Sequence, residues 1–176
     1  EPTVMAFLPE LIAKAKALGK RPSIVTNGLK LADSKYAAML SKKGLFSVWL
    51  SLNALDGRVL EAVDGRDLLK EKMEAVANVK KYINRLVICF SLKPGVNDGE
   101  LKTVLRFALR QYPFVRMFHV EHLDGIGREP VTGGFYLSGL VSLLAEAVGV
   151  DRAAMLDLAG RRRAFLGPYA YQADYR

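Results

Sequence analysis

The chain has 176 residues, a formal net charge of +8 at pH 7 and a hydrophobic fraction of 51%, which suits one domain with a sizeable core. No apolar run approaches the roughly 20 residues that span a bilayer, and no reading-helix or zinc-finger pattern accompanies the charge, so neither membrane nor nucleic acid is an expected partner. The single cysteine, Cys89, excludes an intramolecular disulfide and favours a reducing, cytoplasmic setting.

The first predicted helix covers about residues 3–18, a short strand covers 22–28, and a second helix covers about 34–43. The second helix has a polar cap at its start and Gly44 at its end. The first helix carries apolar residues at helical spacing, which predicts a buried stripe. This stripe consists of Phe7, Leu8, Leu11, Ile12, Ala15 and Leu18.

After a loop through Asp56 and Gly57, the third helix covers about residues 67–82. Its lysines, Lys72 among them, are expected on a solvated face. Its buried stripe is formed by Leu69, Met73, Val76 and Val79.

Further strands are predicted at residues 45–53, 85–93 and 115–123, and a helix capped by Asn97 or Asp98 precedes the last of them. Alternating strands and helices of this length indicate βαβ units and a parallel sheet. A sheet covered by helices on both faces would be nearly apolar throughout. Here one face of the strands becomes polar toward their carboxyl ends, which is typical of a barrel lumen, and four strands make that barrel open and partial.

Three polar motifs each follow one of the first three predicted strands: Thr26-Asn27-Gly28, Ser51-Leu52-Asn53 and Gly95-Val96-Asn97-Asp98. Because the carboxyl ends of parallel strands meet at one edge of a sheet and build the site there, we expect these motifs to share a rim. Together with Glu1-Pro2-Thr3, they resemble the radical S-adenosylmethionine (SAM) enzymes. The likeness is greatest to the group of pyruvate formate-lyase activating enzymes and molybdenum-cofactor protein A.

This resemblance implies a partial parallel β/α barrel that binds SAM and a [4Fe-4S] cluster, and that cleaves SAM reductively to a 5′-deoxyadenosyl radical. Glu1 and Pro2 match the end of a Gly-Gly-Glu-Pro segment that holds the methionine ammonium, which needs acceptors at close range. Thr26 and Asn27 match a turn of the rim beside the cofactor.

The resemblance also implies that Ser51 and Asn53 meet the ribose hydroxyls or the methionine carboxylate. By its position at the rim Lys93 is a candidate for a substrate or carboxylate contact, and His119 is a candidate for a polar contact at the mouth of the lumen. Plainer interpretations stay open. Glu1 could be a solvated residue, Ser51 and Asn53 could simply end a strand, and Lys93 could extend to solvent at the rim. His119 with Glu121 lacks an evident third ligand for zinc.

The cysteine motif of the family, Cys-x-x-x-Cys-x-x-Cys, is absent, and Cys89 supplies at most one of the three thiolates that a cluster needs. The expectation is therefore a fragment of a radical SAM enzyme that by itself binds no cofactor and is inactive. Residues 1–123 would be the carboxyl-terminal portion of the partial barrel, and residues 124–176 would be helices and a tail that pack on it.

The substrate of the whole enzyme could be a small molecule, a peptide or a glycyl-radical enzyme, in which case the enzyme is an activase. Two other readings remain. A cluster-free barrel enzyme of the aldolase or isomerase type would use Lys93 with Glu121. A non-catalytic binding module would use the basic block at residues 161–163.

Overall fold

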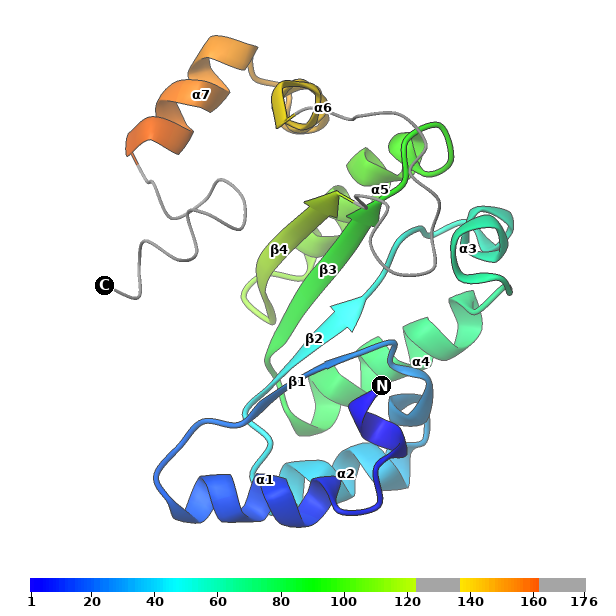
Figure 1. The fold of residues 1–176 in the computed structure, drawn as a ribbon, viewed down its shortest axis with the longest axis vertical. Coiled ribbons are helices and arrows are strands. Elements are labelled where there is room, and N and C mark those ends of the chain that lie inside the picture. The colour runs from blue at the N-terminus through cyan, green and yellow to red at the C-terminus, as the bar shows by residue number, and fades with distance from the viewer. Residues whose placement is uncertain (123–136, 162–176) are drawn as a thin grey trace. The chain divides into compact units, whose positions relative to one another are not determined.

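The computed structural model describes residues 1–122 and 137–161 of the chain. The chain divides into two compact units, residues 1–120 and 121–176. Four strands form one sheet in the order β1-β2-β3-β4 (Figure 1). They are β1 Ser23–Thr26, β2 Ser47–Ser51, β3 Leu86–Leu92 and β4 Val115–His122.

Strand β2 pairs in parallel with both β1 and β3. Ser51 lies opposite Cys89 at the carboxyl end of β2, and Ser23 lies opposite Ser47 at its amino end. The predicted open parallel sheet is therefore confirmed, and the carboxyl ends of β1, β2 and β3 lie along one edge, as a partial β/α barrel requires. The helices of the first unit are η1 Pro2–Val4, α1 Leu8–Ala17, η2 Leu29–Ala32, α2 Ser34–Lys43, α3 Gly57–Asp64, α4 Leu69–Tyr82 and α5 Asp98–Arg110.

Helix α2 has the bounds that its cap and stop signals predict. The Asp33 carboxylate accepts a hydrogen bond from the Lys35 N–H at 2.8 Å, as an N-cap does. Gly44 then ends the helix at a φ of 101°, a left-handed conformation that glycine adopts without a steric penalty.

The single first helix that the sequence predicts is wrong, because η1 and α1 are separate. Pro9 lacks an N–H and clashes with the carbonyl four residues earlier, so a helix tolerates it only in the first turn. Helix α1 accordingly begins at Leu8. Of the predicted apolar stripe, Leu8 and Ile12 are buried, whereas Phe7, Leu11 and Leu18 are exposed.

Helix α3 is the element that the sequence prediction missed. Asp56 and Gly57 suggested a loop, yet the Asp56 carboxylate caps a helix by accepting from the N–H groups of Arg58 and Val59 at 2.8 and 3.3 Å. Leu60 anchors the helix in the core, and Gly65, at a φ of 80°, ends it.

The two faces of the sheet differ in β2 as the alternation predicts, whereas in β3 Val87 and Cys89 of the second face are buried as well. Side chains on one face are fully buried, and α4 and α5 pack against β3 on that side (Figure 1). Trp49 and Ser51, on the other face, are only half-buried. The buried face of β2 and β3 consists of Val48, Leu50, Leu86, Ile88, Phe90 and Leu92.

In the second unit, α6 Leu137–Val148 and α7 Arg152–Arg161 pack against each other, close to the bounds expected for them. The predicted loop at 124–130 and the tail from residue 162 lie outside the described residues, so the predicted packing of 124–176 on the barrel stays a prediction. No helix in the described part of the chain combines the length and apolar character needed to cross a membrane.

Candidate binding site at the strand ends

The Glu1 carboxylate gathers hydrogen-bond donors at the carboxyl end of β1. Its Oε1 accepts from the Thr3 N–H at 3.0 Å, the Thr3 hydroxyl at 2.6 Å and the Thr26 hydroxyl at 2.8 Å. Its Oε2 accepts from the Asn27 N–H at 2.8 Å. The carboxylate thus ties the first residues of the chain to the end of β1, so Glu1 is more than a solvated side chain.

The charge state of Glu1 follows from these contacts. Partial burial alone would raise the pKa of this carboxyl, but the bonds from Thr3, Asn27 and Thr26 outweigh burial and lower the pKa below its ordinary value of 4.5. A carboxylate offers about four acceptor positions, and among the described residues Oε2 accepts from one donor. An anionic oxygen is therefore able to accept a further donor such as an ammonium group.

Tyr36 supports the same corner from α2. Its hydroxyl donates to the Thr3 carbonyl at 3.1 Å. Burial and, after it, the negative charge of Glu1 raise the pKa of Tyr36, because a phenolate would be poorly solvated and would repel the carboxylate. Tyr36 thus stays a neutral donor and holds the segment that carries Glu1.

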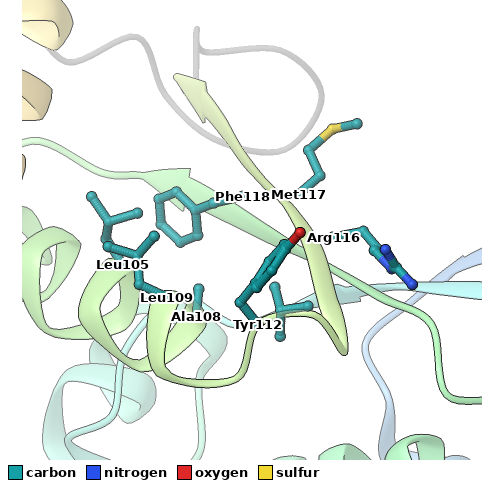
Figure 2. Close-up of a pocket in the computed structure, with 8 residues that line it drawn as sticks. Leu105, Ala108, Leu109, Tyr112, Arg116, Met117 and Phe118 are labelled. Atoms are coloured by element: carbon teal, nitrogen blue, oxygen red, sulfur yellow. The ribbon is translucent and has the colours of Figure 1, made fainter.

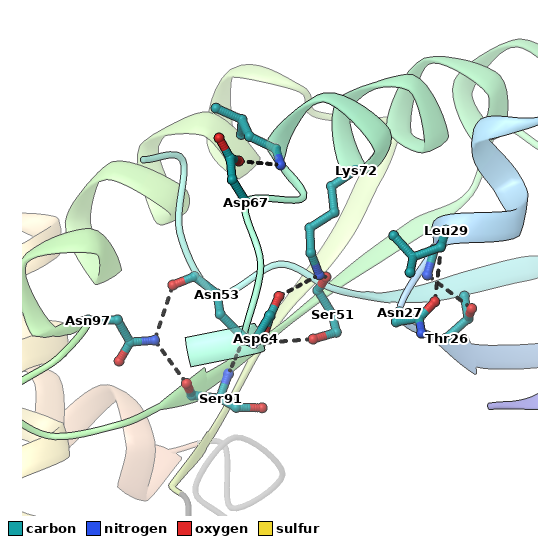
Figure 3. A network of polar contacts seen from close by, with 12 residues as sticks. Thr26, Asn27, Leu29, Ser51, Asn53, Asp64, Asp67, Lys72, Ser91 and Asn97 are labelled. Atoms are coloured by element: carbon teal, nitrogen blue, oxygen red, sulfur yellow. Dashed lines mark hydrogen bonds and ion pairs between the residues drawn. The ribbon is translucent and has the colours of Figure 1, made fainter. Parts of the chain in front are cut away.

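The turn after β1 is built by its own side chains. The Thr26 hydroxyl accepts from the Gly28 N–H at 3.0 Å, and the Asn27 carbonyl oxygen accepts from the Leu29 N–H at 3.1 Å (Figure 3). Gly28 has a φ of 85°, and a Cβ there would lie 2.3 Å from Cδ1 of Leu50. The turn therefore needs glycine both for its backbone conformation and for space.

Asn53 forms the centre of a second polar network, at the end of β2 (Figure 3). Its Nδ2 donates to Asp64 Oδ1 at 3.0 Å and to Ser51 Oγ at 3.4 Å, and its Oδ1 accepts from the Ser91 N–H at 2.9 Å. The residue is 4% exposed. Its amide is thus bonded within the protein, whereas the hydroxyl of the half-buried Ser51 donates to no acceptor among the described residues.

Lys72 enters the same network, although the sequence prediction placed it on a solvated face. This prediction is wrong, because Lys72 is 1% exposed. Its Nζ donates to the Ser51 carbonyl at 2.7 Å and lies 3.1 Å from Asp64 Oδ2 as an ion pair. A signal was present in the sequence. Lys72 shares helical spacing with Ala75, Val76 and Val79, which form the buried stripe that α4 presents to the core.

Asn97 joins β2 to β3 rather than capping α5. It occupies the N-cap position, but its side chain makes no capping hydrogen bond. Instead its Nδ2 donates to the carbonyls of Asn53 and Ser91 at 3.1 and 3.0 Å, and its Oδ1 accepts from the Lys93 N–H at 2.7 Å. The predicted side-chain cap by Asn97 is therefore wrong, and the residue is a structural link between strand ends.

The remaining predicted residues lie in separate surroundings. Pro2 begins η1, and its carbonyl accepts from the Met5 N–H at 3.0 Å. The His119 ring of β4 meets Trp49 of β2 edge to face, with centroids 5.8 Å apart. Within the described residues, no hydrogen bond joins the Glu1 cluster directly to the Ser51–Asn53 network.

An apolar hollow of about 120 Å³ lies between α5 and β4 (Figure 2). None of the predicted site residues lines it. Its lining consists of Leu105, Ala108, Leu109, Tyr112, Val115, Arg116, Met117 and Phe118. The hollow therefore does not belong to the site at the strand ends.

Comparison with known families identifies this arrangement. A model described as the Radical SAM superfamily matches residues 1–108, more than half of the 176 residues. The chain belongs to the radical SAM superfamily. The matched region contains the Glu1 cluster and the whole network around Asn53, so the resemblance inferred from the motifs is confirmed.

Curated relatives agree with this membership. A 7,8-dihydro-6-hydroxymethylpterin dimethyltransferase of Methanocaldococcus jannaschii is 32% identical over 130 residues, which cover 73% of this chain and 26% of that protein. A probable GTP 3′,8-cyclase of Thermococcus kodakarensis is 29% identical over 121 residues, 69% of this chain and 39% of the relative. A GTP 3′,8-cyclase of Helicobacter pylori is 28% identical over 148 residues, 83% of this chain and 45% of the relative. The chain spans less than half the length of each.

Radical SAM enzymes use SAM and a [4Fe-4S] cluster. The residues of this chain are suited to contacts with SAM but cannot hold the cluster. A cluster needs three thiolates, whereas this chain has one cysteine. Cys89 is 8% exposed, and the described residues contain no group of three His, Cys, Asp or Glu side chains able to hold a metal ion. The anionic Glu1 and the half-buried Ser51 hydroxyl do match the ammonium and hydroxyl groups of SAM.

Proposed function

We propose that this chain forms the SAM-binding rim of a radical SAM enzyme. Glu1 Oε2 receives the methionine ammonium, and the Ser51 hydroxyl binds a ribose hydroxyl or the methionine carboxylate. The observation that carries the proposal is the Glu1 carboxylate, which Thr3, Thr26 and Asn27 hold in its charged form at a strand end. A fixed anion in a partly buried corner is a suitable acceptor for an ammonium group.

The residues that line the rim divide into ligand-binding and supporting groups. Ser51 is half-buried on the face of β2 opposite the buried Val48 and Leu50, and its hydroxyl is the group that we propose meets the ligand. Asn53 and Asn97 are both nearly inaccessible to solvent, and their hydrogen bonds hold the strand ends in place. Thr26 and Asn27 act on the ligand through Glu1, and the thiolates of a cluster must come from outside these 176 residues, because the chain has one cysteine.

The relatives favour a small-molecule substrate for the whole enzyme. Their names specify a pterin and GTP, and a pterin and a guanine share the same amino-oxo-pyrimidine ring. We propose a substrate of this heterocyclic class and a transferase or cyclase type of reaction. The named relatives offer no support for the peptide or glycyl-radical-enzyme substrate that the sequence left open.

The proposal is tested by titrating the ¹⁵N-labelled chain with SAM and following its amide resonances. We expect SAM to shift the amides of Thr3, Asn27 and Leu52, which adjoin the Glu1 and Ser51 side chains. The variant S51A should bind SAM about fivefold more weakly, the effect of one hydrogen bond. Ser47 lies at the amino end of the same strand and bonds Ser23, so S47A is the matched control and should bind SAM like the unaltered chain.

Two results would contradict the proposal. The first is the absence of any shift at the strand ends up to about 10 mM SAM, a concentration that detects millimolar dissociation constants. The second is equal binding by S51A and S47A, which would mean that the ligand does not use the carboxyl end of β2.

A further inference from the structure

Lys72 is a buried cation on a helix whose neighbouring lysines, such as Lys70, are exposed. A buried ammonium is costly unless it is paired and hydrogen-bonded. Lys72 Nζ has both kinds of partner, the Asp64 carboxylate at 3.1 Å and the Ser51 carbonyl at 2.7 Å. Both partners belong to the network at the end of β2 (Figure 3).

The contact with Ser51 acts on the backbone. Because Nζ donates to the Ser51 carbonyl, it fixes the peptide plane between Ser51 and Leu52. The Leu52 N–H of the same plane donates to the Cys89 carbonyl at 2.9 Å, so this peptide is held on both sides. Because the allowed rotamers of a side chain depend on the backbone dihedral angles, this constraint limits the directions in which Ser51 can present its hydroxyl.

The contact with Asp64 acts on a side chain. Asp64 Oδ2 faces Lys72, and Oδ1 accepts from Asn53 Nδ2 at 3.0 Å. The same Nδ2 lies 3.4 Å from Ser51 Oγ. Since that hydroxyl oxygen accepts from Asn53, its own proton points elsewhere and is available to an acceptor outside the network.

We propose that Lys72 is a positioning residue, which through the Ser51 carbonyl and the Asp64–Asn53 pair sets the direction of the Ser51 hydroxyl. The direction of the Ser51 hydroxyl follows from the contacts of Lys72, Asp64 and Asn53. Its consequence for SAM binding rests on the proposed function. A purely structural ion pair is the alternative, because such pairs are often replaceable by apolar side chains without loss of stability.

The variant K72M removes the ammonium group and keeps an unbranched side chain that is one atom shorter, and K70M on the same helix is its control. One readout is amide hydrogen exchange of Ser91, whose N–H bonds Asn53 Oδ1, relative to that of Ile88 in the same strand. We expect this ratio to rise about fivefold in K72M, the effect of weakening one hydrogen bond, and to stay unchanged in K70M. A ratio that stays unchanged in K72M would overturn the proposal, since both amides then report only overall stability.

The second readout is SAM affinity in a double-mutant cycle. If Lys72 acts through Ser51, K72M and S51A each weaken SAM binding about fivefold, and the double variant is no weaker than either one. Additive losses, or K72M binding SAM like K70M, would overturn the positioning role. A chain that binds no SAM but shows the local rise in Ser91 exchange would refute the proposed function and leave the positioning of Asn53 supported.

A variant that leaves Asp64 unpaired could unfold the chain. For this reason K72M/D64N is compared with D64N as well, because it removes both buried charges while residue 64 keeps an oxygen that accepts from Asn53. We expect weaker SAM binding by K72M/D64N than by D64N, owing to the lost bond to the Ser51 carbonyl. Equal binding by the two variants would overturn the proposal.

Discussion

At the scale of single residues, the charge on Glu1 links the site to pH. Its pKa is lowered in the folded chain, so its stabilising contribution is fully present above the pKa of the unfolded chain. That contribution is lost as the pH falls through the lower, folded value.

We therefore expect E1Q to lower the free energy of unfolding by about 1 kcal/mol at neutral pH, because the amide accepts these bonds more weakly. The difference from the unaltered chain should vanish as the pH falls well below 4.5. Urea unfolding across this range measures both effects. The control is E10Q, at an exposed position of α1, and a similar pH-dependent loss in E10Q would contradict the account of Glu1.

A second prediction at this scale concerns Asn97, which has three hydrogen-bond partners at the strand ends. We expect N97A to destabilise the chain by about 3 kcal/mol, because it leaves buried backbone groups of Lys93, Asn53 and Ser91 unpaired. Thr103, exposed on α5, provides the control, and T103A should stay within about 0.5 kcal/mol. Chemical denaturation measures both variants, and near-equal stabilities would show that water replaces Asn97.

The positions of Thr26, Asn27, Ser51 and Asn53 at strand ends could be predicted from the sequence, because each follows an apolar run. Their partners could not be predicted, because hydrogen bonds across the chain depend on tertiary packing. The clearest case is Asn53, which the resemblance implied as a ligand contact and whose amide bonds Ser51, Asp64 and Ser91 in the folded chain.

At the scale of elements, the boundaries of helices follow local chemistry wherever a cap and a stop are both present. Helix α2 has Asp33 and Gly44 and agrees with its prediction. The predicted first helix failed because apolar spacing was followed through Pro9, and α3 was missed because Asp56-Gly57 resembles a turn. Pro9 can stand before a helix or in its first turn, and Asp56-Gly57 can form a turn or begin a helix. The packing of neighbouring elements decides between the two conformations in each case.

The turn after β1 gives a prediction at this scale. Gly28 and Gly19 both have positive φ, 85° and 74°, but only at Gly28 would a Cβ meet Leu50, since nothing lies within 4 Å at Gly19. In both alanine variants the free energy of unfolding should fall by about 1–2 kcal/mol, because alanine adopts a left-handed backbone only at that cost. In G28A the free energy of unfolding should fall by about 1–3 kcal/mol more, because the new Cβ overpacks against Leu50. Thermal or urea unfolding gives the comparison, and equal losses would show that Leu50 moves aside freely.

At the scale of the whole molecule, the alternation of strands and helices predicts the order of the sheet, since successive βα units place each new strand beside the last. After residue 123 the sequence shows no comparable alternation of strand and helix patterns, so the predicted packing of residues 124–176 on the barrel stays a prediction. The family membership rests on the first unit, which contains all of the matched residues 1–108.

The cysteine content gives a prediction for the chain as a whole. Anaerobic reconstitution with iron and sulfide should yield no [4Fe-4S] absorption, because one buried cysteine cannot supply three thiolates. The variant C89A should behave identically in the same measurement. A bound cluster that disappears in C89A would contradict this expectation and would require ligands other than cysteine.

The edge-to-face contact between Trp49 and His119 gives the protein an optical probe of its own. Trp49 is the only tryptophan of the chain, so near-ultraviolet excitation of indole reports on a single position. Trp49 lies two residues before Ser51, about 7 Å along the strand, on the same half-buried face of β2. The wavelength and intensity of its fluorescence emission therefore depend on the polarity beside the strand ends. Ligand binding can be followed by fluorescence without labelling the protein.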